Sequence, residues 1–184
     1  MVYLREIATP VGQVILGAMG DKLCLCDWKC NKRRGQNDNR IKRLLGVEFV
    51  DVTSGISKST SDMLEGEQKE SLLVLDRAEQ ELEEYFAGKR KTFEVPLLLV
   101  GTEFQKSVWQ ALLEIPYGEV VDYMDVANRI GNPNGVRAVA QAIGSNPLAI
   151  LVPCHRVVGS NGKLTGFAGG LDAKLQLLEL EKKA

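Results

Sequence analysis

Cys154 and His155 are adjacent in the run Pro153-Cys154-His155-Arg156-Val157, and His155 is the only histidine in the sequence. A free cysteine thiol has a pKa of about 8.5, so little of it is thiolate at neutral pH, and a neighbouring imidazole is the usual group that removes the proton. Imidazole is also the side chain that titrates near neutral pH without help from its surroundings. The pair therefore predicts a nucleophile with its general base. The alternative is a small apolar residue beside a hydrogen-bonded core imidazole.

The composition is that of an ordinary globular protein. The 184 residues are 45% hydrophobic and 26% charged, which suits one good core or two small ones. The net charge of −1 gives no overall basic excess for a nucleic-acid partner, although a local patch would suffice. We find no secretory signal pattern, no membrane-spanning apolar run and no disulfide spacing among the four cysteines. We therefore expect a reduced, cytoplasmic protein without membrane contact. We also expect a monomer, because the sequence shows no exposed apolar stripe that would bind a second subunit.

The first quarter of the chain predicts a small antiparallel sheet. Short apolar runs bounded by turn residues indicate strands at Val2–Ile7, Val11–Ala18 and Lys22–Asp27. The turn Gly20-Asp21 separates the last two strands, which favours a hairpin. The segment 29–43 that follows is strongly basic, and its sequence alone does not reveal its role.

A polar stretch, a helix and an extended linker follow. Residues 53–70 are polar and predict a loop. Apolar residues then recur at helical spacing before Gly88, a typical helix end: Leu72, Leu75, Leu82 and Phe86. The stretch Thr92–Pro96 has the pattern of an extended linker. We therefore expect two domains, at residues 1–92 and 93–184.

The second half contains three helix-start signals. Thr102 with Gln105 three residues later forms a capping-box pattern. Asp122 can cap a second helix, which Gly131 would end, and Asn134 can cap a third. Two short helices joined in this way are typical of a helix-turn-helix.

The third of these helices has one apolar face and one small-residue face. The apolar face is formed by Val136, Val139, Ala140 and Ile143. Arg137, Ala138 and Gln141 lie away from it, so that side carries small side chains and one arginine. Such a surface lets a helix backbone approach a nucleic-acid groove closely, although a solvated helix face fits the same residues.

The chain then leads to Cys154 and to a last helix. Asn146-Pro147 bends it into the apolar run Leu148–Val152, which we interpret as a strand that delivers Cys154. Asp172 can cap the last helix, and Glu181 lies near its end. The helix dipole disfavours a carboxylate at this end of a helix. We therefore expect Glu181 to have a functional partner.

A series of motifs runs through the second half in a fixed order: Ile115-Pro116-Tyr117-Gly118, Ile130-Gly131-Asn132-Pro133, Arg137-Ala138-Val139, Asn146-Pro147, Pro153-Cys154-His155-Arg156-Val157 and Gly166-Phe167-Ala168-Gly169-Gly170-Leu171. With them, residues 93–181 resemble the O6-alkylguanine-DNA alkyltransferase family, the methylated-DNA–protein-cysteine methyltransferases. A bare Cys-His pair is weakly specific, whereas Pro-Cys-His-Arg-Val in this context is highly specific. The first half resembles the family only loosely.

The resemblance implies an α/β (α+β) fold: a ribonuclease H-like N-terminal sheet domain and a C-terminal, mostly helical domain of winged-helix or helix-turn-helix type. It implies a DNA repair enzyme that moves a methyl or larger alkyl group from O6 of guanine, and to some extent from O4 of thymine, to its own cysteine. The thioether formed has no group to hydrolyse it, so each molecule acts once, without a cofactor. The implied partner is double-stranded DNA, bound in the minor groove with the alkylated nucleotide flipped out.

Five catalytic positions carry over from the resemblance, four of them around the thiol and its base, and the fifth, Tyr123, at the guanine. Cys154 is the acceptor, His155 is the base and acts through a water, and Glu181 orients the imidazole. Adjacent residues on an extended chain point to opposite faces, which fits a water between thiol and imidazole. Asn146 holds the turn that presents the cysteine.

Tyr123 and the positions predicted for DNA binding face the DNA. Tyr123 hydrogen-bonds the guanine, with Lys174 nearby, and Arg137 enters the duplex where the nucleotide has left it. Ala138 and Gln141 accompany Arg137 on the side that approaches the groove. Without the resemblance, Tyr123 would be interpreted as a core-edge aromatic and Lys174 as a surface lysine.

Three cysteines of the first half could supply thiolates to a structural zinc. Cys24, Cys26 and Cys30 have suitable side chains, but no second histidine is available to complete a site. Cys24 and Cys26 alternate with leucines, so we expect both on one face of a strand. We interpret them as small strand residues and predict no metal.

Three other classes of protein fit parts of the pattern. A non-catalytic damage binder of the alkyltransferase-like branch would lack the acceptor, which Cys154 supplies. A cysteine hydrolase or acyltransferase would leave the helix-turn-helix unexplained. A transcriptional regulator would need a basic recognition face, which the face around Arg137 does not provide.

Overall fold

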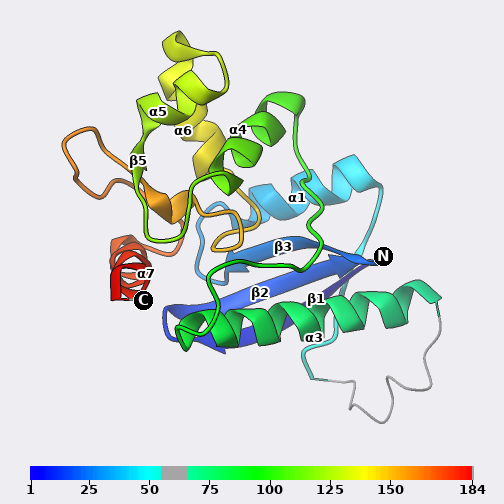
Figure 1. The fold of residues 1–184 in the computed structure, drawn as a ribbon. Coiled ribbons are helices and arrows are strands. Elements are labelled where there is room, and N and C mark those ends of the chain that lie inside the picture. Colours follow the sequence, from blue (N-terminus) through cyan, green and yellow to red (C-terminus); the bar gives the residue numbers. More distant parts are fainter. Residues whose placement is uncertain (55–65, 184) are drawn as a thin grey trace.

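The computed structural model describes residues 1–54 and 66–183. Its N-terminal part is a sheet with strand order β3-β2-β1-β4 (Figure 1), formed by β1 (Val2–Thr9), β2 (Gly12–Met19), β3 (Lys22–Trp28) and β4 (Phe49–Asp51). The three predicted strands are confirmed, and they pair antiparallel. The short β4, which the sequence pattern did not reveal, pairs parallel with β1. The sheet is therefore mixed.

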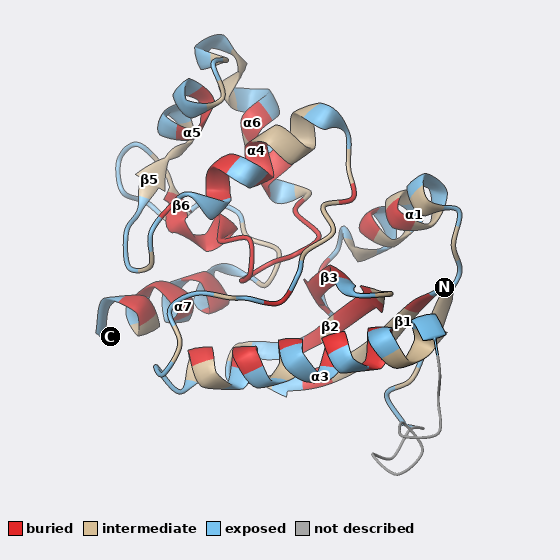
Figure 2. Cartoon of the chain, turned by 45° about the vertical axis from the view of Figure 1, so that its right-hand side comes forward, coloured by how far each residue is buried: buried red, intermediate tan, exposed pale blue. Residues whose placement is uncertain are grey.

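Two helices accompany this sheet. The basic segment folds largely into α1 (Arg34–Leu45), and α3 (Gly66–Phe86) contacts β1, β2 and β3 along one face of the sheet (Figure 1). Buried and exposed residues alternate along α3 (Figure 2), because its apolar side chains recur at helical spacing. Residues 66–70 belong to this helix rather than to the predicted loop, of which residues 55–65 lie outside the described residues.

One continuous core joins the two halves of the chain. Trp28 and Leu75 from the first half are buried in the same cluster as Trp109 and Leu177 from the second. The amide of Leu23 in β3 donates to the carbonyl of Pro96, so the predicted linker packs on the sheet. The chain just after the predicted boundary at 92/93 therefore packs against the sheet of the first half.

The C-terminal part is mostly helical and carries a small parallel pair of strands (Figure 1). In chain order its elements are α4 (Glu103–Leu113), β5 (Val121–Asp122), α5 (Tyr123–Arg129), the 3-10 turn η1 (Pro133–Gly135), α6 (Val136–Gly144), the 3-10 turn η2 (Cys154–Arg156), β6 (Val157–Val158) and α7 (Leu171–Lys183). Both predicted caps at Thr102 and Asp122 form complete capping boxes. The contact between α5 and α6 confirms the helix-turn-helix.

Two predicted caps are wrong. Asn134 lies inside η1, because Pro133, with its fixed φ, starts a helical turn one residue earlier, and Gly135 precedes α6 without a side-chain cap. Asp172 lies in the first turn of α7, which begins at Leu171 directly after the chain reverses at Gly170 (φ 87°). Among the described helices, none has the length and apolar character needed to cross a membrane.

Candidate active site

The chain between α6 and Cys154 is a compact buried turn, so the predicted strand over Leu148–Val152 is wrong. Its residues form only isolated bridges, and Ile150 has a φ of 72°, the one non-glycine residue with a positive φ in the described chain. A β-branched residue in this region is strained, so the surrounding contacts must hold it there. An apolar run indicates burial, but it does not distinguish a strand from a buried turn.

Asn146 and the backbone of β3 hold this turn. The Nδ2 of Asn146 donates to the carbonyl of Val152 (2.9 Å), and its Oδ1 accepts from the amide of Leu148 (3.0 Å). The amide and the carbonyl of Cys26 in β3 each form a 2.8 Å hydrogen bond with the turn. The segment that presents Cys154 is therefore fixed on the N-terminal sheet.

Cys154 lies at the start of η2 and is only 7% exposed. The extended geometry expected at Cys154 and His155 is wrong: a 3-10 turn rotates successive side chains by about 120°, so the two still diverge. Burial raises the pKa of the Cys154 thiol to about 11, against the opposing hydrogen bond of Asn146. The thiol is therefore protonated at neutral pH, and it would have to lose this proton to act as a nucleophile.

His155 is fully buried and pairs with Glu181 from α7. Its Nε2 lies 2.7 Å from Oε1 of Glu181. Burial lowers the pKa of His155 in spite of this carboxylate, and the positive charges of Arg156 and Lys174 act in the same direction. A neutral imidazole against an ionised carboxylate must carry its proton on Nε2. Nδ1 of His155 then carries a lone pair and no proton, and it makes no hydrogen bond within the described residues.

Glu181 accepts five hydrogen bonds. Oε1 accepts from His155 Nε2 (2.7 Å), Tyr85 Oη (2.7 Å) and Arg156 Nη2 (3.0 Å). Oε2 accepts from Arg156 Nε (2.9 Å) and the amide of Gly118 (3.1 Å). Burial alone would raise the pKa of Glu181, but the hydrogen bonds of His155 and Arg156 outweigh it and hold that pKa far below its usual range.

Of the four partners of Glu181, sequence analysis predicted His155 and missed Arg156, Tyr85 and the amide of Gly118. Arg156 stands inside the Pro-Cys-His-Arg-Val motif, and its position beside His155 was the signal that could have revealed it. Its guanidinium also donates to the carbonyl of Ile115 (2.6 Å). Tyr85 lies in α3, 96 residues before Glu181, and no local pattern connects the two.

Lys174 is a buried residue. It is 1% exposed, and its Nζ donates to the carbonyls of Val157 (2.6 Å) and Thr165 (3.3 Å). Burial lowers its pKa. The alternative interpretation as a surface lysine is therefore wrong. Lys174 and Glu181 are seven residues apart, so two turns of α7 bring both to the same buried face.

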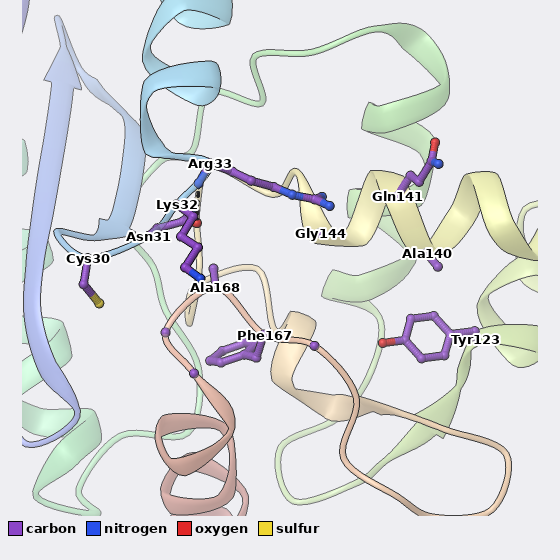
Figure 3. A pocket seen from close by; sticks show the side chains of 13 residues that line it. Cys30, Asn31, Lys32, Arg33, Tyr123, Ala140, Gln141, Gly144, Phe167 and Ala168 are labelled. Atoms are coloured by element: carbon purple, nitrogen blue, oxygen red, sulfur yellow. Dashed lines mark hydrogen bonds between the residues drawn. The ribbon is translucent and has the colours of Figure 1, made fainter.

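A pocket of about 740 Å³ is lined by residues from four parts of the chain. Tyr123 of α5, Gln141 of α6 and Phe167 of the loop 166–170 line it, together with Lys32 and Arg33 from the first half (Figure 3). The hydroxyl of Tyr123 lies 2.7 Å from that of Thr165.

The side of α6 that carries the other predicted DNA contacts is open. Arg137, Ala138 and Gln141 are exposed, whereas Val139 and Ile143 are buried in the core, as the pattern of α6 predicts. The helix-turn-helix therefore presents the small-residue face with its single arginine to solvent.

The cysteines of the first half do not share a face. The register of β2 and β3 shifts between Gly17 and Ala18, which places Cys24 in a smaller core cluster and Cys26 in the main core. The expectation that both lie on one strand face is therefore wrong. Within the described ranges, no three His, Cys, Asp or Glu side chains form a group that could hold a metal ion.

Comparisons with known proteins agree over both halves. A family model described as the ribonuclease-like domain of 6-O-methylguanine DNA methyltransferase matches residues 2–99, and one described as its DNA binding domain matches residues 103–183. A methylated-DNA–protein-cysteine methyltransferase of Mycobacterium leprae is 55% identical over 182 residues, which are 99% of this chain and 93% of the relative. One from Methanosarcina acetivorans is 62% identical over 138 residues, covering 74% of this chain and 85% of the relative.

A solved structure supports the same assignment. The crystal structure of Mycobacterium tuberculosis OGT in complex with DNA has a TM-score of 0.77 and 37% identity, and the match covers 98% of this chain and 93% of that one. The buried Cys-His-Glu arrangement behind a helix-turn-helix and the matches to both domains point the same way. The chain belongs to the 6-O-methylguanine DNA methyltransferase family.

Proposed function

We propose that this protein is a methylated-DNA–protein-cysteine methyltransferase. It repairs DNA by moving a methyl or larger alkyl group from O6 of guanine, and to some extent from O4 of thymine, to Sγ of Cys154. The observation that carries the proposal is His155, a buried neutral imidazole fixed on Glu181 through Nε2, with its Nδ1 lone pair free of hydrogen bonds within the described residues. Such an imidazole is a general base with a defined tautomer.

The transfer is a displacement at a saturated carbon. The thiol proton of Cys154 passes through a water to Nδ1 of His155, an S–C bond forms, and the C–O bond to the guanine breaks with its electron pair going to the oxygen. The hydroxyl of Tyr123 hydrogen-bonds the departing base. Because the thiol is protonated at rest, deprotonation accompanies the binding of the alkylated nucleotide. The thioether stays on the protein, so each molecule acts once.

The exposed face of α6 approaches the minor groove. Arg137 fills the space left by the flipped nucleotide, and the small side chain of Ala138 lets the helix backbone come close, with Gln141 beside it. Lys174 acts from inside the protein: its two carbonyl contacts join α7 to the chain that leads into the loop 166–170. A cytoplasmic, monomeric protein is part of this proposal, supported by its free cysteines.

The direct test is the mass of the protein after incubation with a duplex that contains O6-methylguanine. We expect one methyl group per molecule, located on Cys154 by peptide mapping. Cys154→Ser should bind the duplex and take no methyl group, whereas Cys30→Ser, which changes an exposed cysteine, should react like the wild type. A wild-type protein without an adduct, or with many turnovers per molecule, contradicts the proposal.

A second test concerns Arg137. We expect Arg137→Ala to slow methyl transfer from duplex DNA while transfer from the free base O6-benzylguanine stays unchanged, because the free base needs no flipping. Single-turnover rates with the two substrates measure this difference. Equal rates of duplex repair in the variant and the wild type would contradict the role of Arg137.

A further inference from the structure

Tyr85 brings the N-terminal domain into contact with the catalytic carboxylate. It lies in the last turn of α3, is fully buried, and donates its hydroxyl to Oε1 of Glu181 at 2.7 Å. This is as short as the contact of the same oxygen with Nε2 of His155. Tyr85 and His155 therefore share one acceptor atom.

The ring of Tyr85 is fixed by other aromatic rings. Its centroid lies 5.3 Å from that of Phe86, 5.3 Å from that of Phe93 and 6.1 Å from that of Tyr117. Burial, and after it the charge of Glu181, raise the pKa of Tyr85, so the phenol stays protonated and can only donate to the carboxylate. The hydroxyl is thus a fixed donor, placed by the fold of the first half.

We propose that Tyr85 is a positioning residue for the alkyl transfer: its hydrogen bond fixes Oε1 of Glu181 and limits how strongly this oxygen holds the imidazole proton of His155. The proposal rests on the proposed function of Cys154 and His155. It deepens that function by making α3 of the N-terminal domain part of the base assembly.

The direction of the effect follows from the groups that face the imidazole. These are Glu181 and Lys174 from α7 and Arg156 from its own turn, and Tyr85 from α3 acts through Glu181. Removal of the Tyr85 hydroxyl leaves the carboxylate of Glu181 with one hydrogen-bond donor fewer. This carboxylate is then a stronger acceptor for the Nε2–H of His155. The stronger acceptor stabilises the imidazolium form, so the pKa of His155 should rise.

The test uses Tyr85→Phe, with Tyr117→Phe as the matched control. Tyr117 belongs to the same aromatic group, but its buried hydroxyl has no hydrogen-bond partner within the described residues. Because His155 is the only histidine, ring ¹⁵N chemical shifts report its protonation without ambiguity. We expect the midpoint of the His155 titration to rise by about 0.5 to 1 pH unit in Tyr85→Phe and to stay at the wild-type value in Tyr117→Phe.

Alkyl transfer should follow the same shift. On the acid side of the pH profile we expect Tyr85→Phe to react about three- to tenfold more slowly than the wild type, as the neutral fraction of the imidazole falls. Equal midpoints in Tyr85→Phe and the wild type, or equal shifts in both variants, overturn the proposal. The ¹⁵N titration needs no reaction, so it separates a failure of this inference from a failure of the proposed function.

Discussion

At the scale of single residues, the site depends on the carboxylate of Glu181, which serves two cationic or potentially cationic neighbours. Arg156 donates two hydrogen bonds to this carboxylate, and His155 donates one that orients its ring. Burial, and after it the charges of Arg156 and Lys174, lower the pKa of His155 although the carboxylate lies 2.7 Å away. The proton-accepting atom then lies on the far side of the ring from Glu181.

The pH dependence of transfer follows from this neutral imidazole. Burial holds the pKa of His155 below its usual 6.5, and the base is active when neutral. The transfer rate should therefore fall as the imidazole gains a proton, and it should reach half of its plateau value only below pH 6.5. Single-turnover reactions with an alkylated duplex at a series of pH values measure this profile, and a rate already halved at pH 6.5 contradicts it.

Removal of the charge of Glu181 should destabilise the fold. Glu181→Gln leaves the buried guanidinium of Arg156 without a counter-charge, and we expect the free energy of unfolding to fall by about 3–5 kcal/mol. The folded-state pKa of Glu181 is depressed, so its contribution is present above its usual value of 4.5 and is lost as the pH falls below it. Urea unfolding at neutral and acid pH measures both effects. Glu179→Gln, an exposed change on the same helix, is the control that should unfold like the wild type.

At the scale of elements, the loop 166–170 is held against β3 by a close approach of its backbone. A Cβ at Gly169 would lie 2.4 Å from the indole of Trp28, whereas one at Gly166 would meet open space. Both glycines line the same pocket. Only Gly169 is therefore required for packing.

Gly169→Ala should displace this loop from Trp28. We expect the free energy of unfolding to fall by about 1–3 kcal/mol, with slower alkyl transfer, because the loop forms one wall of the pocket. Gly166→Ala adds the same methyl group to the same loop and should keep wild-type stability. Thermal unfolding and single-turnover rates compare the two variants, and equal losses would contradict the packing argument.

The elements that sequence patterns predicted well are those with local signals. The capping boxes at Thr102 and Asp122 need residues only three apart, and both are present. The compact turn over Leu148–Val152 was predicted as a strand, because two of the hydrogen bonds that fix it come from Cys26 in β3, more than a hundred residues away. Asn134 shows the limit of single-residue cap signals, since the proline before it decides where the helical turn starts.

At the scale of the whole molecule, the basic side chains of the segment 29–43 differ in whether they pair with a carboxylate. Lys29 pairs with Glu6 (2.9 Å), and Lys42 pairs with Glu48 (2.9 Å). Lys32 and Arg33 are exposed and line the pocket shared with Tyr123 (Figure 3). The first half of the chain therefore adds two cations to the side of the molecule that carries α6.

These two cations should strengthen DNA binding. We expect the double variant Lys32→Ala/Arg33→Ala to bind duplex DNA more weakly. The plot of the logarithm of its binding constant against the logarithm of the salt concentration should be less steep, by up to about 0.9 for each phosphate that the protein no longer neutralises. Lys29→Ala/Lys42→Ala changes the net charge equally but removes paired lysines, so it should change the affinity less. Fluorescence anisotropy at several salt concentrations measures both, and equal reductions in affinity would indicate an effect of net charge alone.

The sequence by itself determined the Cys154-His155 pair and the helix-turn-helix, because adjacency and short spacings carry these features, and its family motifs supplied the other candidate residues. Only the tertiary structure decided the surroundings of Cys154 and His155. In the folded chain the pair is buried in a 3-10 turn, and His155 contacts Glu181, which is 26 residues away in the sequence. Tyr85 contacts the same carboxylate from 96 residues away. Burial sets the proton states of this site, and burial depends on which distant segments pack together, which local sequence patterns do not record.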